Sequence, residues 1–316
     1  MHTQDFEVLQ HARQWCESDS APWLCTIVAA TGSSPRPVGS MLVASPDGQQ
    51  VGSVSGGCVE EDLLERLRAG EFDPQRIHLQ DYGVSAEENE RLGLPCGGRL
   101  TILLQALTPS DCPWLDEILA ALDDRHCIER QLDLESGQTL LVSRKQFADL
   151  SLESSTLHQS FGPQMRMLLV GAGQLAQSLS ELALAMDYEV MVTDTRQLML
   201  SQWEGPDVPL LQGMPDDIVR EHASDRRSVI ITLTHDPRID DMALMEALGT
   251  EAWYVGALGS MRTTTARLER LRQLDIPEEQ IDRLYAPVGL DIGSKTPHEI
   301  AISIMAQLVQ LRRSSH

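Results

Sequence analysis

Apolar residues in the second half of the chain form short uninterrupted runs, which alternate with segments of helical periodicity. Such runs are typical of parallel strands that are covered on both faces. The runs that predict strands cover residues 166–170, 189–193, 208–212, 228–234 and 252–257. Because the connections between these strands and the helical segments are short, the pattern predicts a mainly parallel, doubly wound sheet over residues 165–316.

The first half of the chain has a different pattern, in which apolar runs are separated by tight turns. A hairpin with its turn at residues 46–48, and a second one across 126–143, indicate antiparallel pairing. Helices are expected over 59–70 and 112–123. We therefore expect an α/β chain with a mixed α/β domain over residues 1–149. The polar, serine-rich segment 150–164 is predicted to be a linker.

Composition sets the outer limits of function. The 316 residues are 42% hydrophobic, enough for two ordinary cores, and carry a net charge of −22. So acidic a surface repels phosphate backbones and anionic membranes, hence neither nucleic acid nor a membrane is expected as a partner. The polar amino terminus and the absence of an apolar run near the roughly 18 residues of a membrane helix predict a soluble, cytoplasmic protein.

A glycine fingerprint follows the strand at 166–170. In VGAGQLAQ, Gly171 and Gly173 allow a tight turn and close approach of a ligand to the backbone. Asp194 ends the next strand, about 20 residues after Gly173, where an acidic side chain reaches a ribose hydroxyl. This order predicts a Rossmann-like domain with a dinucleotide-type crevice. The alternative is a glycine turn that only packs a helix.

Further candidates follow two later strands of the same predicted sheet. His235 and Asp236 follow one strand, and Gly256 and Gly259 end another. Ligands in open α/β sheets lie outside the carboxyl ends of the strands, so these residues are expected at the edge that carries the fingerprint. His235 and Asp236 are a candidate acid/base or orienting pair, although an aspartate before proline also caps turns.

The first domain contains a proline-framed loop and two glycine turns with cysteine. Arg36, within GSSPRP, is a candidate ligand for phosphate or carboxylate, or else a solvated surface arginine. The residues of the two turns are Gly56, Gly57 and Cys58, and Cys96, Gly97 and Gly98. Glycine lets a ligand approach, and a helix start favours a thiolate, but the acidic residues 60–62 oppose one at Cys58. Cys96 is therefore the favoured thiol; burial as a small hydrophobic side chain is the alternative.

The six cysteines contain no C-x-x-C pair, which excludes the usual spacing of a zinc site and gives no obvious disulfide framework. All of them precede residue 130. Any thiol chemistry is thus predicted to belong to the first domain.

Seven motifs in order carry a resemblance to a known family. They are GSSPRPVGSMLV, GSVSGGCVEEDLL, PCGGRLTILL, LLVGAGQLAQ, LTHDPRIDD, YVGALGSMRT and APVGLDIGSKTPHEIAISI. From about residue 25 to the carboxyl terminus, the chain resembles the XdhC/CoxI family of molybdenum hydroxylase maturation factors. Gln174 and Ala176 stand where many relatives carry His and Gly, which leaves the phosphate geometry open.

The resemblance implies a maturation chaperone rather than an enzyme. Such a protein binds molybdenum cofactor in its mono- or dinucleotide form, supports its sulfuration and delivers it to an apo-hydroxylase of the xanthine dehydrogenase or aldehyde oxidase type. A cysteine desulfurase partner and a homodimer are implied with it. The turn with Gly171 and Gly173 suits the phosphate of the cofactor. The soft thiolates of Cys96 and Cys58 are candidate ligands for the metal.

Two other functions compete with this one. An NAD(P)-dependent oxidoreductase would use Asp194 for the adenosine ribose and His235 as its acid/base, the only attractive candidate at the strand ends of the second domain. A nucleotide-sensing interaction protein would bind a nucleotide without changing a substrate or a client.

Overall fold

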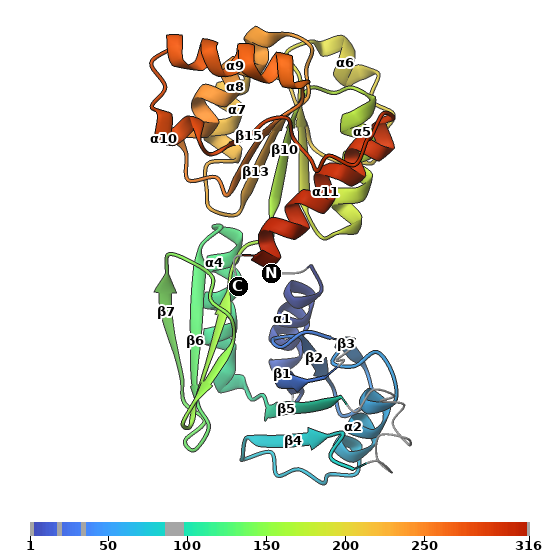
Figure 1. Ribbon diagram of the computed structural model, residues 1–316. Coiled ribbons are helices and arrows are strands. Elements are labelled where there is room, and N and C mark those ends of the chain that lie inside the picture. The colour runs from blue at the N-terminus through green and yellow to red at the C-terminus, as the bar shows by residue number, and fades with distance from the viewer. Residues whose placement is uncertain (1–2, 18–20, 33–35, 86–97, 315–316) are drawn as a thin grey trace. The chain divides into compact units, whose positions relative to one another are not determined.

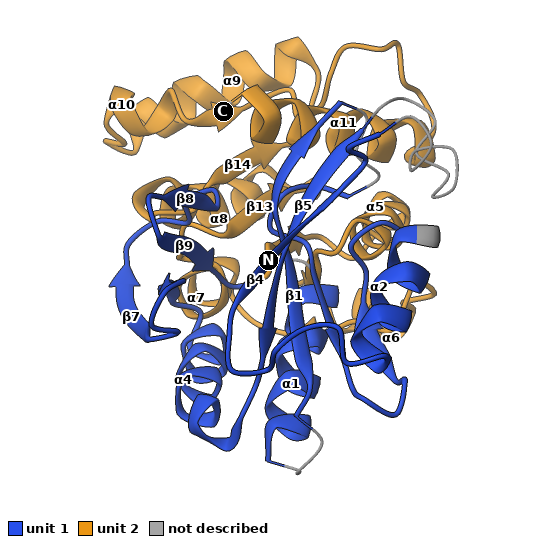
Figure 2. Cartoon of the chain, turned by 90° about the horizontal axis from the view of Figure 1, so that it is seen from below, with its two compact units in different colours: residues 1–163 blue, residues 164–316 orange. Residues whose placement is uncertain are grey.

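The chain divides into two compact units, residues 1–163 and 164–316 (Figure 2). The computed structural model describes residues 3–17, 21–32, 36–85 and 98–314. Within these ranges no helix is long and apolar enough to cross a membrane.

Unit 2 is a six-stranded parallel sheet in the order β12-β11-β10-β13-β14-β15. Its strands are β10 (Arg166–Val170), β11 (Glu189–Thr193), β12 (Leu210–Leu211), β13 (Ser228–Thr232), β14 (Tyr254–Ala257) and β15 (Leu284–Tyr285). The first strand lies at the centre, and the order of the sheet reverses there. This is the doubly wound arrangement that the apolar runs predict, with a ligand crevice expected at the reversal.

Helices cover both faces of this sheet (Figure 1). They are α5 (Gln174–Ala185), α6 (Gln197–Ser201), α7 (Pro215–His222), α8 (Pro237–Gly249), α9 (Met261–Gln273), α10 (Glu278–Ile281) and α11 (Pro297–Ser314). Successive residues of the central strand β10 point to opposite faces of the sheet, and each face packs against its own layer of helices. Met167 and Leu169 pack in the core with α5 and α11, whereas Leu168 and Val170 pack in the core with α7 and α8.

Unit 1 contains two antiparallel sheets. The five-stranded sheet has the order β3-β2-β1-β5-β4, and the four-stranded sheet has the order β7-β6-β9-β8. The strands are β1 (Trp23–Thr31), β2 (Met41–Ala44), β3 (Gln50–Gly52), β4 (His78–Tyr82), β5 (Arg99–Ala106), β6 (Cys127–Asp133), β7 (Thr139–Arg144), β8 (Ser151–Glu153) and β9 (Thr156–Phe161). The helices are α1 (Thr3–Cys16), α2 (Cys58–Arg68), the short 3₁₀ helix η1 (Pro109–Asp111) and α4 (Cys112–Asp123).

The five-stranded sheet has a separate core on each face. Ile27 and Ile102 pack with Leu63 of α2 on one face. On the other face, Leu24 packs with Leu9 of α1 and with α4. Strand residues that alternate between the faces therefore reach different helices, and the unit is a mixed α/β domain.

The predicted linker is wrong. Residues 151–161 form β8 and β9, and β9 pairs with β6 along its whole length, from Thr156 opposite Asp133 to Phe161 opposite Ile128. Phe161 is 2% exposed. The segment has a polar sequence because buried positions of β9 are occupied by Gln159 and Ser160, and its partner strand β6 is distant in the sequence.

Glu60 organises the turn that leads into α2. Its carboxylate accepts hydrogen bonds from the backbone amides of residues 54–57, at 2.6–3.0 Å, and from the hydroxyls of Ser53 and Ser55. Burial by itself would raise the pKa of this carboxyl, but the hydrogen bonds outweigh it and lower the pKa to about 2. The turn therefore folds around an internal anion.

We predict that Glu60→Gln lowers the free energy of unfolding by about 2 kcal/mol at pH 7, because the amide loses charge-assisted hydrogen bonds. The folded pKa lies below the ordinary value of 4.5, so the carboxylate stabilises the fold above that pH, and its effect fades as the pH falls toward 2. Chemical denaturation at pH 7 and pH 3.5 measures both differences.

The exposed neighbour Glu61 supplies the control, because Glu61→Gln removes one charge from the same helical turn. This control should change the free energy of unfolding by less than about 0.5 kcal/mol. An equal loss for Glu60→Gln at both pH values would contradict the prediction.

Candidate functional site

The glycine fingerprint forms the turn between β10 and α5. Gly171 has a φ of 114°, and a Cβ there would lie 3.0 Å from Cγ2 of Thr234 and 3.2 Å from its backbone nitrogen. Gly173 is the N-cap of α5, with a φ of −93°, and a Cβ there would meet no heavy atom within 4 Å. The fold thus requires glycine at 171 but not at 173, where open space lies over the start of the helix.

The start of α5 is a favourable place for an anion. Gly173 has no side chain to cap the helix, and among the described residues no side-chain cap hydrogen bond is made there. Converging amides and the helix dipole favour a phosphate at such a position.

Asp194 follows β11 and is tied to the same turn. Its Oδ2 accepts a hydrogen bond from the Ala172 amide at 3.0 Å. Arg196 forks onto both carboxylate oxygens, with Nε–Oδ1 and Nη2–Oδ2 distances of 2.9 Å. Burial by itself would raise the pKa of Asp194. The hydrogen bonds from Arg196 and Ala172 outweigh that effect, so the pKa lies below its ordinary value. A ribose at Asp194 would therefore have to share the carboxylate with Arg196, whose side chain is 60% exposed.

A charged pocket of about 600 Å³ lies beside this ion pair. We define it by residues 194–196 and 234–239. It brings together Asp194, His235 and Asp236, which the sequence placed after two separate strands. Asp236 also caps α8, accepting a hydrogen bond from the Arg238 amide at 3.0 Å, so the capping alternative is correct for this residue.

Two residues of the charged pocket escaped sequence reasoning. Arg238 forks onto Asp236 as Arg196 does onto Asp194, with Nε–Oδ1 and Nη2–Oδ2 distances of 3.1 and 2.8 Å. The hydrogen bonds from Arg238 lower the pKa of Asp236 to about 2. The repeated Asp-x-Arg sequence after β11 and β13 is the signal that would have revealed both arginines.

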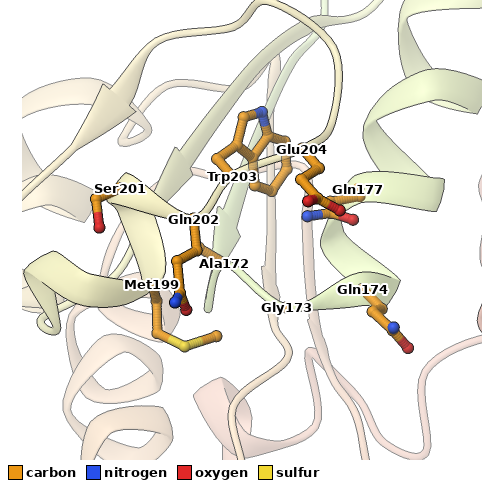
Figure 3. Close-up of a pocket in the computed structure, with 9 residues that line it drawn as sticks. All are labelled: Ala172, Gly173, Gln174, Gln177, Met199, Ser201, Gln202, Trp203 and Glu204. Atoms are coloured by element: carbon orange, nitrogen blue, oxygen red, sulfur yellow. The ribbon is translucent and has the colours of Figure 1, made fainter.

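A second pocket, of about 480 Å³, adjoins the fingerprint on α5 and the segment after α6 (Figure 3). We call it the amide pocket. Its lining residues are Ala172, Gly173, Gln174, Gln177, Met199, Ser201, Gln202, Trp203 and Glu204. None of them was singled out for this role by the sequence, apart from Gly173. The glycine turn therefore adjoins two pockets of different charge.

Gly256 and Gly259 line neither pocket. Gly256 lies inside β14, where a Cβ would lie 2.7 Å from Cε1 of Tyr254 and 2.8 Å from Cγ2 of Val288. Packing alone therefore requires glycine at this position. Gly259 precedes the N-cap of α9, and a Cβ there would lie 3.2 Å from the Thr263 side chain.

A buried ion pair joins the ends of β13 and β14. Arg267 and Asp240 are each 2% exposed, with an Nη2–Oδ2 distance of 2.8 Å. Arg267 also donates to the Leu258 carbonyl oxygen, and the Thr234 hydroxyl donates to Asp240 at 2.7 Å. The pair therefore holds the loop of the charged pocket against the neighbouring strand end.

The described candidates of unit 1 lie in three different segments of the chain. Gly56 and Gly57 are exposed, with open space where a Cβ would lie, but their amides already bond to Glu60. Arg36 is partly buried in the loop after β1, and Gly98 is buried before β5. Cys58 begins α2, and its side chain, like all of Cys96 and Gly97, lies outside the described residues. The part of the chain that is described holds no cluster of three His, Cys, Asp or Glu side chains suited to a metal.

Comparison with known proteins assigns the family. The XdhC Rossmann domain model matches residues 167–308, and the XdhC and CoxI family model matches residues 15–83. A probable xanthine dehydrogenase subunit of Bacillus subtilis is 26% identical, over 92% of this chain and 93% of that protein. The molybdenum cofactor insertion chaperone PaoD of Escherichia coli is 27% identical, over 96% of this chain and 88% of that protein.

A solved structure has the same fold along the whole chain. The crystal structure of a xanthine dehydrogenase from Bacillus halodurans superposes with a TM-score of 0.78 and 27% identity, covering 99% of this chain and 97% of that one. The two family models together span well over half of the sequence. On this evidence the chain belongs to the XdhC/CoxI family.

Proposed function

We propose that this chain is a maturation chaperone that binds molybdenum cofactor, supports its sulfuration and delivers it to a xanthine dehydrogenase or aldehyde oxidase type enzyme. The names of the relatives support a role in cofactor insertion. The observation that carries the proposal is the turn at Gly173, an uncapped helix start that lines the amide pocket and whose neighbour Ala172 bonds to Asp194 of the charged pocket.

The residues of this crevice fit the chemistry of the cargo. The cofactor carries a phosphate, or a pyrophosphate in its dinucleotide form, which suits the amides at the start of α5. In the dinucleotide form, a ribose would approach Asp194 and displace part of the Arg196 fork. Arg196 would then be available to pair with a phosphate oxygen, while Arg238 stays on Asp236.

The thiols supply a second part of the proposal. Cys96 and Cys58 belong to unit 1, and soft thiolates suit a transition metal. We assign to Cys96 the role of holding or screening molybdenum while a terminal oxo ligand is exchanged for sulfide. A cysteine desulfurase would supply the sulfur, and the acidic start of α2 leaves Cys58 the weaker candidate.

The charged pocket favours one other function. The strand order of unit 2, with Asp194 after β11, is also that of proteins that bind NAD(P), and His235 lies in the same pocket. An oxidoreductase would bind the nicotinamide nucleotide there and use His235 as its acid/base. The two functions differ in whether a bound ligand is transformed or delivered.

We predict that Gly173→Val weakens binding of molybdenum cofactor at least tenfold, because the new side chain fills the space that the phosphate must enter. The protein should remain folded, since a Cβ at this position meets nothing and φ is −93°. Cofactor retained after purification, measured as molybdenum per chain, tests the binding. Thermal denaturation tests the fold.

Gly249→Val is the matched control for this variant, because Gly249 also lies in unit 2 with open space where a Cβ would lie. The control should bind like the wild type. Unchanged cofactor binding by folded Gly173→Val would show that the turn only packs a helix.

The second prediction separates a chaperone from an oxidoreductase. Purified protein supplied with NAD or NADP and a panel of small alcohols and aldehydes should form no reduced nucleotide, because a carrier binds and releases its cargo unchanged. Absorbance at the nicotinamide band measures turnover. Steady formation of NADH or NADPH that is lost in His235→Ala would overturn the chaperone proposal.

The third prediction concerns Cys96. Cys96→Ala should stay folded but lose most bound molybdenum cofactor and fail to activate an apo-hydroxylase, because the metal loses a soft ligand. Cys16→Ala, which removes a buried thiol that donates to the Thr108 carbonyl, should cost roughly 1 kcal/mol of stability and leave activation intact. Full activation of the apo-hydroxylase by Cys96→Ala would show that this cysteine is not a ligand of the metal.

A further inference from the structure

The amide pocket differs in its chemistry from the charged pocket. Among the described residues, its polar lining consists of glutamines, one serine and the carboxylate of Glu204, with no basic side chain. The charged pocket, in contrast, contains two arginines and two aspartates. The amide pocket therefore suits a neutral ligand with several hydrogen-bonding groups rather than a second phosphate.

Hydrogen-bonding capacity is left unused on the walls of the amide pocket. Gln177, Gln202 and Glu204 make no side-chain hydrogen bond or ion pair with the residues that the structure describes. Figure 3 shows the Gln177 amide, on α5, and the Glu204 carboxylate, on the segment after α6, pointing toward one another. The Gln177 amide, which can both donate and accept, and the Glu204 carboxylate, which accepts, thus lie together at one end of the pocket.

An aromatic wall completes this end of the pocket. The Trp203 indole N–H donates to the Pro206 carbonyl oxygen at 2.9 Å, which fixes the ring. Gly205 permits the arrangement, because a Cβ there would lie 2.5 Å from Cζ2 of Trp203 and 3.1 Å from Cγ of Gln177. The ring is consequently preorganised beside the polar groups, with its own donor already used.

This combination matches one class of heterocycle. A pterin presents an amino group and a ring N–H side by side, and a carbonyl oxygen next to them. A carboxylate accepts both N–H groups in parallel, an amide donates to the carbonyl, and an aromatic ring stacks on the bicycle.

We infer that the amide pocket binds the pterin end of the cofactor, with Glu204 accepting from the amino edge and Gln177 donating to the carbonyl. The inference rests on the proposed function, and it adds a position for the pterin. Because Ala172 and Gly173 line the pocket, a phosphate at the start of α5 adjoins the pterin that it is linked to. The charged pocket then receives whatever lies beyond the phosphate, the nucleoside in a dinucleotide form.

The test uses a pterin without metal or phosphate, so that it reports on this pocket alone. Binding of the uncharged 6-hydroxymethylpterin to the full chain is followed by equilibrium dialysis and by tryptophan emission. Wild-type protein should bind the probe, and Glu204→Gln should weaken binding at least tenfold, because the new amide N–H opposes the donors of the pterin. Glu181→Gln, on the exposed face of α5, is the matched control and should bind like the wild type.

Guanine shares the same hydrogen-bonding edge, so guanosine, which carries no phosphate, forms a second arm of the test and adenosine a third. Stronger binding of 6-hydroxymethylpterin than of either nucleoside is expected. Binding of guanosine in preference to the pterin, or equal pterin binding by wild type and Glu204→Gln, would overturn the assignment.

Molybdenum retained by wild-type protein from cells that make the cofactor is measured separately. If the wild type retains molybdenum while the pterin does not bind, the proposed function stands and the pocket assignment fails. If the pterin binds through Glu204 but no molybdenum is retained, the pocket assignment stands and the proposed function fails.

Discussion

The crevice of unit 2 depends on the absence of a side chain at Gly171. Its amide donates to the Thr193 carbonyl at 2.7 Å, and the Leu233 amide donates to the Val170 carbonyl at 2.8 Å, so three strand ends meet there. The left-handed conformation of Gly171 and its close approach to Thr234 leave no room for a Cβ. Because the strand ends meet so closely, the start of α5, Asp194 and the loop after β13 share one edge of the sheet.

The turns before α2 and α5 both place backbone amides at the start of a helix, but only the turn before α2 contains its own anion. Before α2, converging backbone amides and hydroxyls enclose the carboxylate of Glu60, so the anion is part of the chain. Before α5, Gly173 provides no side-chain acceptor, and a Cβ there would meet no heavy atom of the described residues within 4 Å. The turn before α2 therefore stabilises unit 1 through its own carboxylate, whereas we propose that the turn before α5 binds an external anion.

An acidic protein can accept an anionic cargo because its local charges are paired. The net charge is −22, yet Asp194 and Asp236 are each neutralised by an arginine two residues later. These ion pairs and the helix dipole determine the field within the crevice over a few ångströms, while salt screens the more distant carboxylates. Binding at this site is therefore compatible with a surface that repels polyanions.

The sequence by itself determined what depends on local pattern. It predicted β10 and β11 to the residue, the two glycines of the fingerprint, and Asp194 at the end of the following strand. It also placed His235 and Asp236 at the correct edge, since parallel strands end on the same side. These features are encoded within a few residues of one another, and periodicity reveals them.

Tertiary structure decided what depends on partners distant in the sequence. Residues 151–161 form strands because β6 pairs with β9 and β9 pairs with β8, and a Cβ at Gly256 would be crowded by Tyr254 and Val288. The amide pocket arises only when Gln177 on α5 and Glu204, which follows α6, lie close together. Local propensity does not report such contacts, because their energy comes from burial and pairing that exist only in the folded chain.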